Sequence, residues 1–396
     1  MTGCRAIVAF LLLLLLPATD ASAFEVLWTR KFDVPVDGDF VPSGSTLFLR
    51  TGKWPGNKNG ELHATEAATG KDLWVSRGAA PEAGDILPVG NVVLSRIVPV
   101  KEGDYFPKGR HYGIIAFDRT TGSEVWRKWF KDQFSRTQMT SDGSAGFLLL
   151  MSPSGINYFS ASDGVVLWEF DPCVFDKDFK LLTADLPPKR PHPCDDREVD
   201  IDFDGMVFGP DAVYVSSGEG AVYSLDKKTG AMRWSTYIPR KPWWTEPIRS
   251  ILEDGRLYVA FSELSYNALD AGTGKLLWQA DIRPNTHPLK VGKRIFVTSG
   301  MRAREQGYTN EFTLFALDAD TGKTLWKFPG GYFTKPVFFK GLVWVATGEG
   351  ELLGFDPETG AKKERLALPG GKPGGIEADA ERLYVSMGEN TLYAVR

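Results

Sequence analysis

The sequence predicts an all-β fold: an eight-bladed β-propeller built from four-stranded antiparallel blades. Three observations predict it. A hairpin ending in tryptophan recurs along the chain, its copies lie about 48 residues apart, and the two ends of the chain together supply one further copy. A sequence period of this length suits one four-stranded blade.

The clearest copy is Phe315–Trp326, FALDADTGKTLW. Apolar residues alternate with small or polar ones up to Asp318, which indicates a half-buried strand. The Thr321-Gly322 pair predicts a tight turn, because glycine adopts the positive φ that such a hairpin needs. The tryptophan that follows offers a large face to bury and an indole N–H that needs an acceptor.

Every copy places its tryptophan position four residues after the turn glycine. The tryptophans are Trp28, Trp74, Trp126, Trp168, Trp234, Trp278 and Trp326. The turn glycines are Gly70, Gly122, Gly164, Gly230, Gly274, Gly322 and Gly360. The last glycine is followed by Glu364 where a tryptophan is expected, so this copy is degenerate.

The ends of the chain predict how the ring closes. The C-terminal segment stops before a turn of its own, and Glu25–Trp28 is a strand with no turn before it. We therefore expect one propeller domain over residues 24–396, with its eighth blade formed by 365–396 together with 24–32. The other blades are expected to end near residues 74, 126, 168, 234, 278, 326 and 364.

The AxDxxTGxxxW pattern of these copies resembles the repeat of the quinoprotein-like, or PQQ-repeat, propellers. This superfamily includes quinoprotein alcohol dehydrogenases and the BamB-type subunit of the outer-membrane β-barrel assembly machine, and the resemblance covers the chain after residue 23. It implies that the repeated tryptophans and glycines are structural and dock one blade on the next. The repeat alone therefore does not imply bound PQQ.

Residues 1–23 have the pattern of a secretion signal. Arg5 precedes an apolar core at 6–16, and Ala21-Ser22-Ala23 suits cleavage before Phe24. The alternative, a membrane anchor, needs roughly 20 apolar residues. Cys4 lies ahead of the apolar core and cannot be a lipidated cysteine at the cleavage point, which departs from the BamB-type pattern. We expect a protein without a membrane anchor, located in the periplasm or outside the cell.

Composition and cysteine count bound the function further. The formal net charge of −4 gives no reason to expect nucleic acid as a partner. After cleavage only Cys173 and Cys194 remain, which predicts a disulfide in an oxidising compartment, worth roughly 3 kcal/mol in the chain-entropy model. Two free thiols are the alternative, and the spacing of the pair does not favour metal ligation.

Four long insertions predict a binding face. They fall between the second and third strands of three blades and between the third and fourth blades, positions that share one face of a propeller. The four insertions are 51–61, 98–111, 300–310 and 169–202. We expect a protein partner on this face; neutral drift in loop length is the alternative.

Acidic residues near the largest insertion suggest a cation site. Asp200, Asp202 and Asp204 precede Gly205, and together with Asp211 they match the spacing of a calcium loop. The segment alternates apolar residues with the acids, so a solvated acidic strand is the alternative.

Alignment of the blades predicts a ring of polar side chains at the mouth of the central channel, on the insertion side. The residues leading into the innermost strands are Asp39, Asp85, Gln138, Asp204, Glu246, His287, Lys335 and Gly374. Such a ring could hold a cation or a polar ligand, or it could simply line a channel filled with water.

Two functions from different classes follow. The first is a non-enzymatic scaffold that binds a protein partner, as a monomer or as a subunit of a complex, in envelope or outer-membrane protein assembly. The second is a small quinoprotein oxidoreductase using PQQ and Ca²⁺, with Asp204 and neighbouring acids as metal ligands and an acid such as Asp39 or Asp85 as base. Against the enzyme stands the lack of the vicinal Cys-Cys pair that the resemblance implies for those dehydrogenases.

Overall fold

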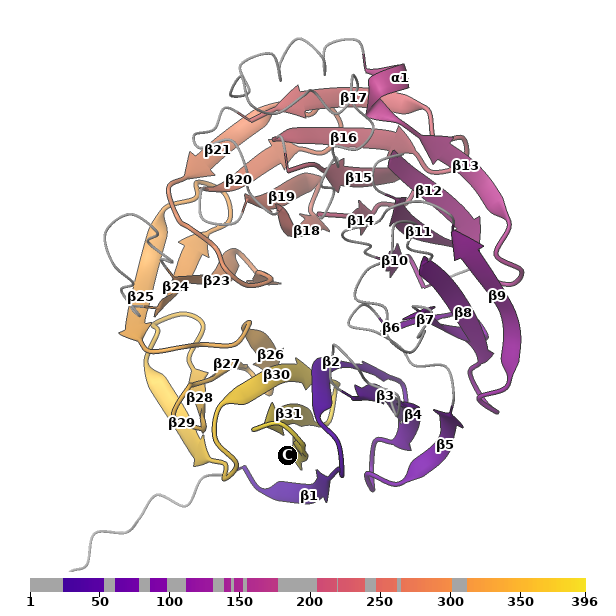
Figure 1. Cartoon of the computed structure of the whole chain (residues 1–396). Helices are drawn as coiled ribbons and strands as arrows, with labels where there is room; N and C mark the ends of the chain where they lie inside the picture. Colours follow the sequence, from indigo (N-terminus) through magenta and orange to yellow (C-terminus); the bar gives the residue numbers. More distant parts are fainter. Residues whose placement is uncertain are drawn as a thin grey trace, which may run out of the picture.

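The computed structural model describes residues 24–52, 61–77, 86–97, 112–130, 139–143, 146–151, 155–176, 205–218, 220–238, 247–261, 265–300 and 312–396. These residues form 32 strands and one short helix, α1 (Pro172–Phe175). The strands make eight four-stranded antiparallel sheets arranged as blades around a ring (Figure 1). The predicted eight-bladed β-propeller is therefore confirmed.

Each blade runs from its innermost to its outermost strand. The first blade consists of β2 (Val36–Ser43), β3 (Thr46–Thr51), β4 (Glu61–Glu66) and β5 (Asp72–Arg77). The second consists of β6 (Ile86–Val89), β7 (Val92–Ile97), β8 (Tyr112–Asp118) and β9 (Glu124–Phe130). The third consists of β10 (Met139–Ser141), β11 (Gly146–Met151), β12 (Gly155–Ser160) and β13 (Val166–Phe170). The fourth consists of β14 (Val207–Phe208), β15 (Ala212–Ser216), β16 (Ala221–Asp226) and β17 (Met232–Tyr237).

The second half of the ring repeats this plan. The fifth blade consists of β18 (Pro247–Glu253), β19 (Arg256–Phe261), β20 (Ser265–Asp270) and β21 (Leu276–Ala280). The sixth consists of β22 (Leu289–Val291), β23 (Arg294–Gly300), β24 (Phe312–Asp318) and β25 (Thr324–Gly330). The seventh consists of β26 (Val337–Phe339), β27 (Leu342–Ala346), β28 (Glu351–Phe355) and β29 (Lys362–Ala367). The eighth consists of β30 (Pro373–Ala378), β31 (Leu383–Met387), β32 (Thr391–Val395) and β1 (Val26–Lys31).

The eighth blade closes the ring as predicted. Its outermost strand, β1, comes from the N-terminal part of the sequence and pairs antiparallel with β32. Trp28 lies opposite Ala394, and Lys31 lies opposite Thr391. In Figure 1 the indigo strand β1 lies beside the yellow strands of this blade.

The hydrophobic core lies between the blades. The described residues contain eight clusters of buried apolar side chains, and each cluster is shared by two neighbouring blades. Both faces of the middle strands are therefore buried, which explains why strands such as β27 are a continuous apolar run rather than an alternating one. Folding of each blade depends on the blades beside it.

The repeat turn is built by its aspartate and its glycine. In the sixth blade the Asp318 carboxylate accepts hydrogen bonds from the backbone N–H (2.8 Å) and the hydroxyl (2.7 Å) of Thr321. The N–H of Gly322 donates to the Asp318 carbonyl at 2.8 Å, and Gly322 has a φ of +70°. Glycine reaches this left-handed conformation without the penalty that a Cβ brings.

Each repeat tryptophan contacts the turn of the next blade. Its indole N–H donates, at 2.9–3.1 Å, to the carbonyl of the residue three positions before the next turn glycine. The donor–acceptor pairs are Trp28–Ala67, Trp74–Arg119, Trp126–Ala161, Trp168–Lys227, Trp234–Ala271, Trp278–Ala319 and Trp326–Pro357. A Cβ on the turn glycine would lie only 2.5–3.0 Å from the indole ring. Glycine is thus needed for space as well as for φ.

The degenerate copy at Glu364 has a structural explanation. A tryptophan there would contact the turn between the third and fourth strands of the eighth blade. That blade has no such turn, because β32 and β1 come from opposite ends of the sequence. Phe24, just before β1, packs at this interface instead. Its ring lies edge-on to Trp344 at 4.6 Å and 6.0 Å from Phe339, and it belongs to the cluster between the seventh and eighth blades.

Candidate functional site

The long connections gather at one end of the ring, which we call the insertion-bearing face. Antiparallel strands place every second-to-third connection, and every connection to the next blade, at the same end. Residues 52–60 join β3 to β4, 98–111 join β7 to β8, 301–311 join β23 to β24, and 171–206 join β13 to β14. All four predicted insertions therefore emerge on this face, although most of their residues lie outside the described part of the chain.

Two members of the predicted channel-mouth ring have described side chains. Lys335 precedes β26, and its ammonium forms an ion pair with Glu377 of β30, the innermost strand of the next blade. His287 precedes β22 and is partly buried. The alignment of the blades pointed to Gly374 in the eighth blade and missed Glu377, because aligned backbone positions do not show which side chain reaches the neighbouring strand.

Of the other members of that ring, Gly374 lies in β30, and the side chains of the remaining five lie outside the described part of the chain. Asp39 lies within β2 rather than ahead of it. The pairing of β2 with β3 shifts register between Val36 and Phe40, and the side chain of Asp39 is not described. Asp85, Asp204 and Glu246 lie outside the described residues, as does position 138.

The predicted calcium ligands Asp200, Asp202 and Asp204 also lie outside the described residues. Within the described residues no group of three or more His, Cys, Asp or Glu side chains lies close enough to hold a metal ion. Asp211, the last acid of the calcium-loop pattern, instead accepts a hydrogen bond from Arg233 at 3.0 Å.

Cys173 lies in α1, immediately after the third blade, and packs against the core between the third and fourth blades. The Asp171 side chain accepts from the Cys173 backbone N–H at 2.9 Å and so caps the helix. Cys194 lies outside the described residues, so the disulfide stays a prediction.

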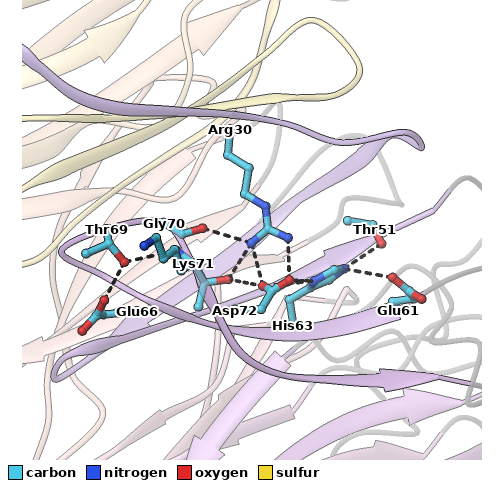
Figure 2. A network of polar contacts seen from close by, with 10 residues as sticks. Arg30, Thr51, Glu61, His63, Glu66, Thr69, Gly70, Lys71 and Asp72 are labelled. Atoms are coloured by element: carbon cyan, nitrogen blue, oxygen red, sulfur yellow. Dashed lines mark hydrogen bonds and ion pairs between the residues drawn. The ribbon is translucent and has the colours of Figure 1, made fainter.

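A network of polar contacts joins the eighth blade to the first (Figure 2). Arg30 of β1 extends across the interface, and its two terminal guanidinium nitrogens, Nη1 and Nη2, each donate to a carboxylate oxygen of Asp72 of β5 at 2.6 Å. It also donates to the carbonyl of Gly70 at 3.1 Å. Paired hydrogen bonds of this geometry are among the strongest between side chains.

His63 of β4 extends the cluster toward the insertion-bearing face. One ring nitrogen, Nδ1, lies 3.3 Å from both carboxylate oxygens of Asp72, and the other, Nε2, lies 3.1 Å from the Thr51 hydroxyl. Nε2 is also 3.5 Å from the Glu61 carboxylate. Thr51 and Glu61 are the residues at which β3 ends and β4 begins, so the cluster reaches the base of the connection at 52–60.

The electrostatics of the cluster centre on Asp72. Partial burial raises the pKa of its carboxyl, but hydrogen bonds from His63 and Arg30 outweigh this and hold the pKa well below the usual range. Because an ionised carboxylate can only accept, Nδ1 of His63 carries a hydrogen toward it. The Arg30 guanidinium also lies over the Phe32 ring at 4.3 Å, and Phe32 in turn meets the His63 ring edge-on.

The order Thr51–His63–Asp72 resembles the nucleophile, base and acid of a hydrolase triad. Its surroundings do not suit such chemistry, because Thr51 is 1% exposed and His63 is 4% exposed. The carboxylate is also already bound by Arg30. The cluster therefore connects two blades.

A sequence signal for this cluster exists. The residue two positions after Trp28 is Arg30, and the equivalent Lys128 and Thr236 likewise donate to the turn glycine carbonyl of the next blade. Asp72, two residues after the turn glycine, is the only aspartate at that position among the seven copies. The signal for the cluster is a residue at which this copy differs from the other copies, so the residues that the copies share do not reveal it.

The fold and its blade contacts define an eight-bladed β-propeller of the tryptophan-docked type. The family described as outer membrane protein assembly factor BamB matches residues 58–173, 202–308 and 310–396, so the chain belongs to that family. This agrees with the resemblance inferred from the repeat.

A curated relative lies in the dehydrogenase branch. Quinohemoprotein alcohol dehydrogenase ADH IIB of Pseudomonas putida is 25% identical over 196 residues, which cover 45% of this chain and 26% of that protein. The chain thus matches only about a quarter of the length of this relative.

Solved structures share the fold. BamB from Moraxella catarrhalis aligns with a TM-score of 0.67 and 14% identity, over 94% of this chain and 99% of that one. Quinohemoprotein alcohol dehydrogenase ADHIIG from Pseudomonas putida HK5 gives 0.63 and 12%, over 94% and 76%. A computationally designed protein, Ika8, gives 0.62 and 13%, over 92% and 98%. At these identities the likeness shows the fold alone.

Among the described residues, no helix has both the length and the apolar character needed to cross a membrane.

Proposed function

We propose that this protein is an exported scaffold that binds a protein partner through its insertion-bearing face, within outer-membrane protein assembly. The observation that carries the proposal is the family match, which covers residues 58–173, 202–308 and 310–396. The gathering of the longest connections on one end of the ring supports it, because binding residues concentrate on loops held by a rigid scaffold. A face of this kind suits an interface of roughly 800 Å² per partner.

The described cluster has a supporting role in this function. Arg30, Asp72 and His63 hold the eighth blade to the first, and the cluster ends at the base of the connection at 52–60. We expect this bracing to keep the spacing of the loops constant, so that the partner meets a preformed surface.

Export completes the proposal. Residues 1–23 act as a leader that is removed before Phe24, and the mature protein acts in the periplasm or outside the cell. A Cys173–Cys194 disulfide then fixes the start of the longest connection to the third blade.

The test is binding of the mature protein to the purified outer-membrane assembly machine of the same organism. Replacing residues 98–111, and separately 301–311, with short Gly-Ser linkers should weaken binding about tenfold or more, or about 1.4 kcal/mol. The matched control is Lys275→Glu with Lys323→Glu, two exposed residues of the opposite face. Binding that survives both loop replacements but is lost in the control would refute the proposed face.

A second candidate function is quinone-dependent oxidation, which the 25% identical stretch shared with a quinohemoprotein alcohol dehydrogenase favours. Among the described residues, no three His, Cys, Asp or Glu side chains lie close enough together to hold a metal ion. Calorimetric titration of the mature protein with PQQ and Ca²⁺ tests this function directly. Stoichiometric binding that Asp204→Asn abolishes would support it, whereas no heat of binding at high micromolar ligand would exclude it.

A further inference from the structure

On the insertion-bearing face, the connections of the seventh and eighth blades are short and lie fully within the described part of the chain. We call these four connections the short-connection sector. They comprise residues 331–336, 347–350, 368–372 and 388–390. The long connections at 301–311, in the sixth blade, and at 52–60, in the first blade, lie on either side of this sector in the ring.

Backbone hydrogen bonds tie the connections of this sector to one another. The donor–acceptor pairs, each at 2.9 Å, are Gly348–Tyr332, Leu368–Gly350 and Gly388–Lys372. The connections also pack closely, because a Cβ on Gly388 would lie 2.3 Å from the carbonyl oxygen of Gly370. A surface held in this way is preformed, so a partner that binds it does not have to order it.

Tyr332 is the half-buried aromatic residue of this sector. Its phenol ring meets the ring of Phe312 edge-on at 5.7 Å, and Phe312 begins β24 directly after the connection at 301–311. Burial raises the pKa of the Tyr332 hydroxyl, so this group stays neutral around pH 7. Tyrosine side chains that their neighbours hold in place and that remain partly exposed are typical anchors of protein interfaces.

Two exposed side chains of opposite charge lie beside Tyr332. The ammonium of Lys372 lies 4.1 Å from the centre of the Tyr332 ring. The carboxylate of Glu349 lies against Gly331, since a Cβ added to that glycine would be 3.1 Å from Oε1 of Glu349. Neither charged group has an ion-pair partner among the residues that the structure describes. Both charges are therefore available to a partner.

From these contacts we propose that the short-connection sector binds the partner through Tyr332, Lys372 and Glu349. The partner segment presents an apolar or aromatic side chain to Tyr332, an acidic one to Lys372 and a basic one to Glu349. Because the two charges are opposite and come from different connections, they fix the orientation of the segment, which a single charge would not do. This inference rests on the proposed function and identifies the chemistry of the partner that the insertion-bearing face binds.

The experiment measures binding of mature variants to the purified outer-membrane assembly machine of the same organism, at low and at high salt. Lys372→Glu and Glu349→Lys should each weaken binding about tenfold, because each replaces an attraction with a repulsion. The double variant has the net charge of the parent protein but the reverse charge pattern, so it should bind more weakly than either single variant. These losses should shrink at high salt, because exposed charges are screened.

The aromatic anchor is tested in the same assay. Tyr332→Ala should weaken binding about tenfold or more at either salt concentration. Tyr332→Phe keeps the ring and should bind like the parent protein, which separates loss of the contact from loss of folding.

The matched charge control is Lys340→Glu. The ammonium of Lys340 also lies over aromatic rings, at 5.6 Å from that of Phe24 and 5.5 Å from that of Phe339. Lys340 belongs, however, to the turn between β26 and β27, on the opposite face of the ring. Binding of this variant should be unchanged.

The outcomes separate this inference from the proposed function. Parent-like binding of the double variant, or tighter binding of either charge reversal, would overturn the proposed chemistry of the partner. Unchanged binding of Tyr332→Ala and of both charge reversals, with binding lost when 301–311 is replaced, would overturn this inference and leave the proposed function in place. A parent protein that does not bind the machine would refute both.

Discussion

Replacing Gly322 with alanine isolates the contact by which one blade docks on the next. Gly322 has a φ of +70°, and a Cβ there would lie 2.5 Å from the Trp278 ring. Gly255 is a matched control, because its φ is +71° and nothing lies within 4 Å of the Cβ that it would gain. The two substitutions share the backbone cost and differ only in the tryptophan.

The magnitudes follow from these two environments. Alanine in the left-handed conformation costs roughly 1–2 kcal/mol at either site. At Gly322 the added methyl must also displace Trp278, which costs about 1–3 kcal/mol as overpacking. The displacement also strains the indole hydrogen bond to the Ala319 carbonyl, now 3.1 Å long and worth about 1 kcal/mol. We expect Gly322→Ala to lower the free energy of unfolding by about 2–4 kcal/mol more than Gly255→Ala does.

Urea unfolding followed by circular dichroism and tryptophan fluorescence measures both variants against the parent protein. The urea midpoint of Gly322→Ala should fall well below that of Gly255→Ala. The tryptophan fluorescence of the Gly322→Ala variant should also change at urea concentrations below those at which unfolding begins. Equal midpoints for the two variants would refute the docking role of the glycine–tryptophan contact.

Three further outcomes test the ring closure. In a double-mutant cycle of Arg30→Met and Asp72→Asn, the coupling energy should be about 1–2 kcal/mol, because the pair is bidentate and three-quarters buried. If the losses in unfolding free energy of the two single variants simply add up in the double variant, the pair is dispensable. Since the pKa of the Asp72 carboxyl is depressed in the folded state, its contribution is present above about pH 4 and is lost as the pH falls further. The gap in unfolding free energy between the parent and Asp72→Asn should therefore narrow in acid, and a gap that stays constant from about pH 7 to about pH 2 would contradict this. Glu364→Trp should bring no stabilisation, because the eighth blade has no turn to receive the indole ring. Trp326→Ala, in contrast, should lower the free energy of unfolding by about 3 kcal/mol. A clear gain in thermal midpoint for Glu364→Trp would disprove our account of the degenerate copy.

The repeat made the blade count and the closure predictable. Each copy is a local pattern, in which apolar alternation, a turn glycine and a tryptophan lie within about twelve residues. Local patterns of this kind determine strands and turns from the sequence, and a regular period multiplies them into a ring. For the same reason the sequence pattern alone assigns the connections that carry the insertions to one face.

The candidate site was far less predictable, because its members come from distant parts of the chain. Arg30 and Asp72 are 42 residues apart, and neither belongs to the repeat pattern. His63 stands out in the sequence only as one of four histidines. Their meeting depends on which faces of neighbouring blades are brought together, and residue spacing within a single blade does not contain that information.

The sequence by itself determined the class of fold, the number of blades and the presence of a closing strand, because these depend on short-range alternation and on period. Only the tertiary structure decided that Phe24 packs where a turn is missing, that Glu377 meets Lys335, and that a triad-like group is buried. The physical reason is that contacts between blades are made by side chains from separate sheets. Their partners are set by the packing of those sheets around the ring, which no local segment specifies.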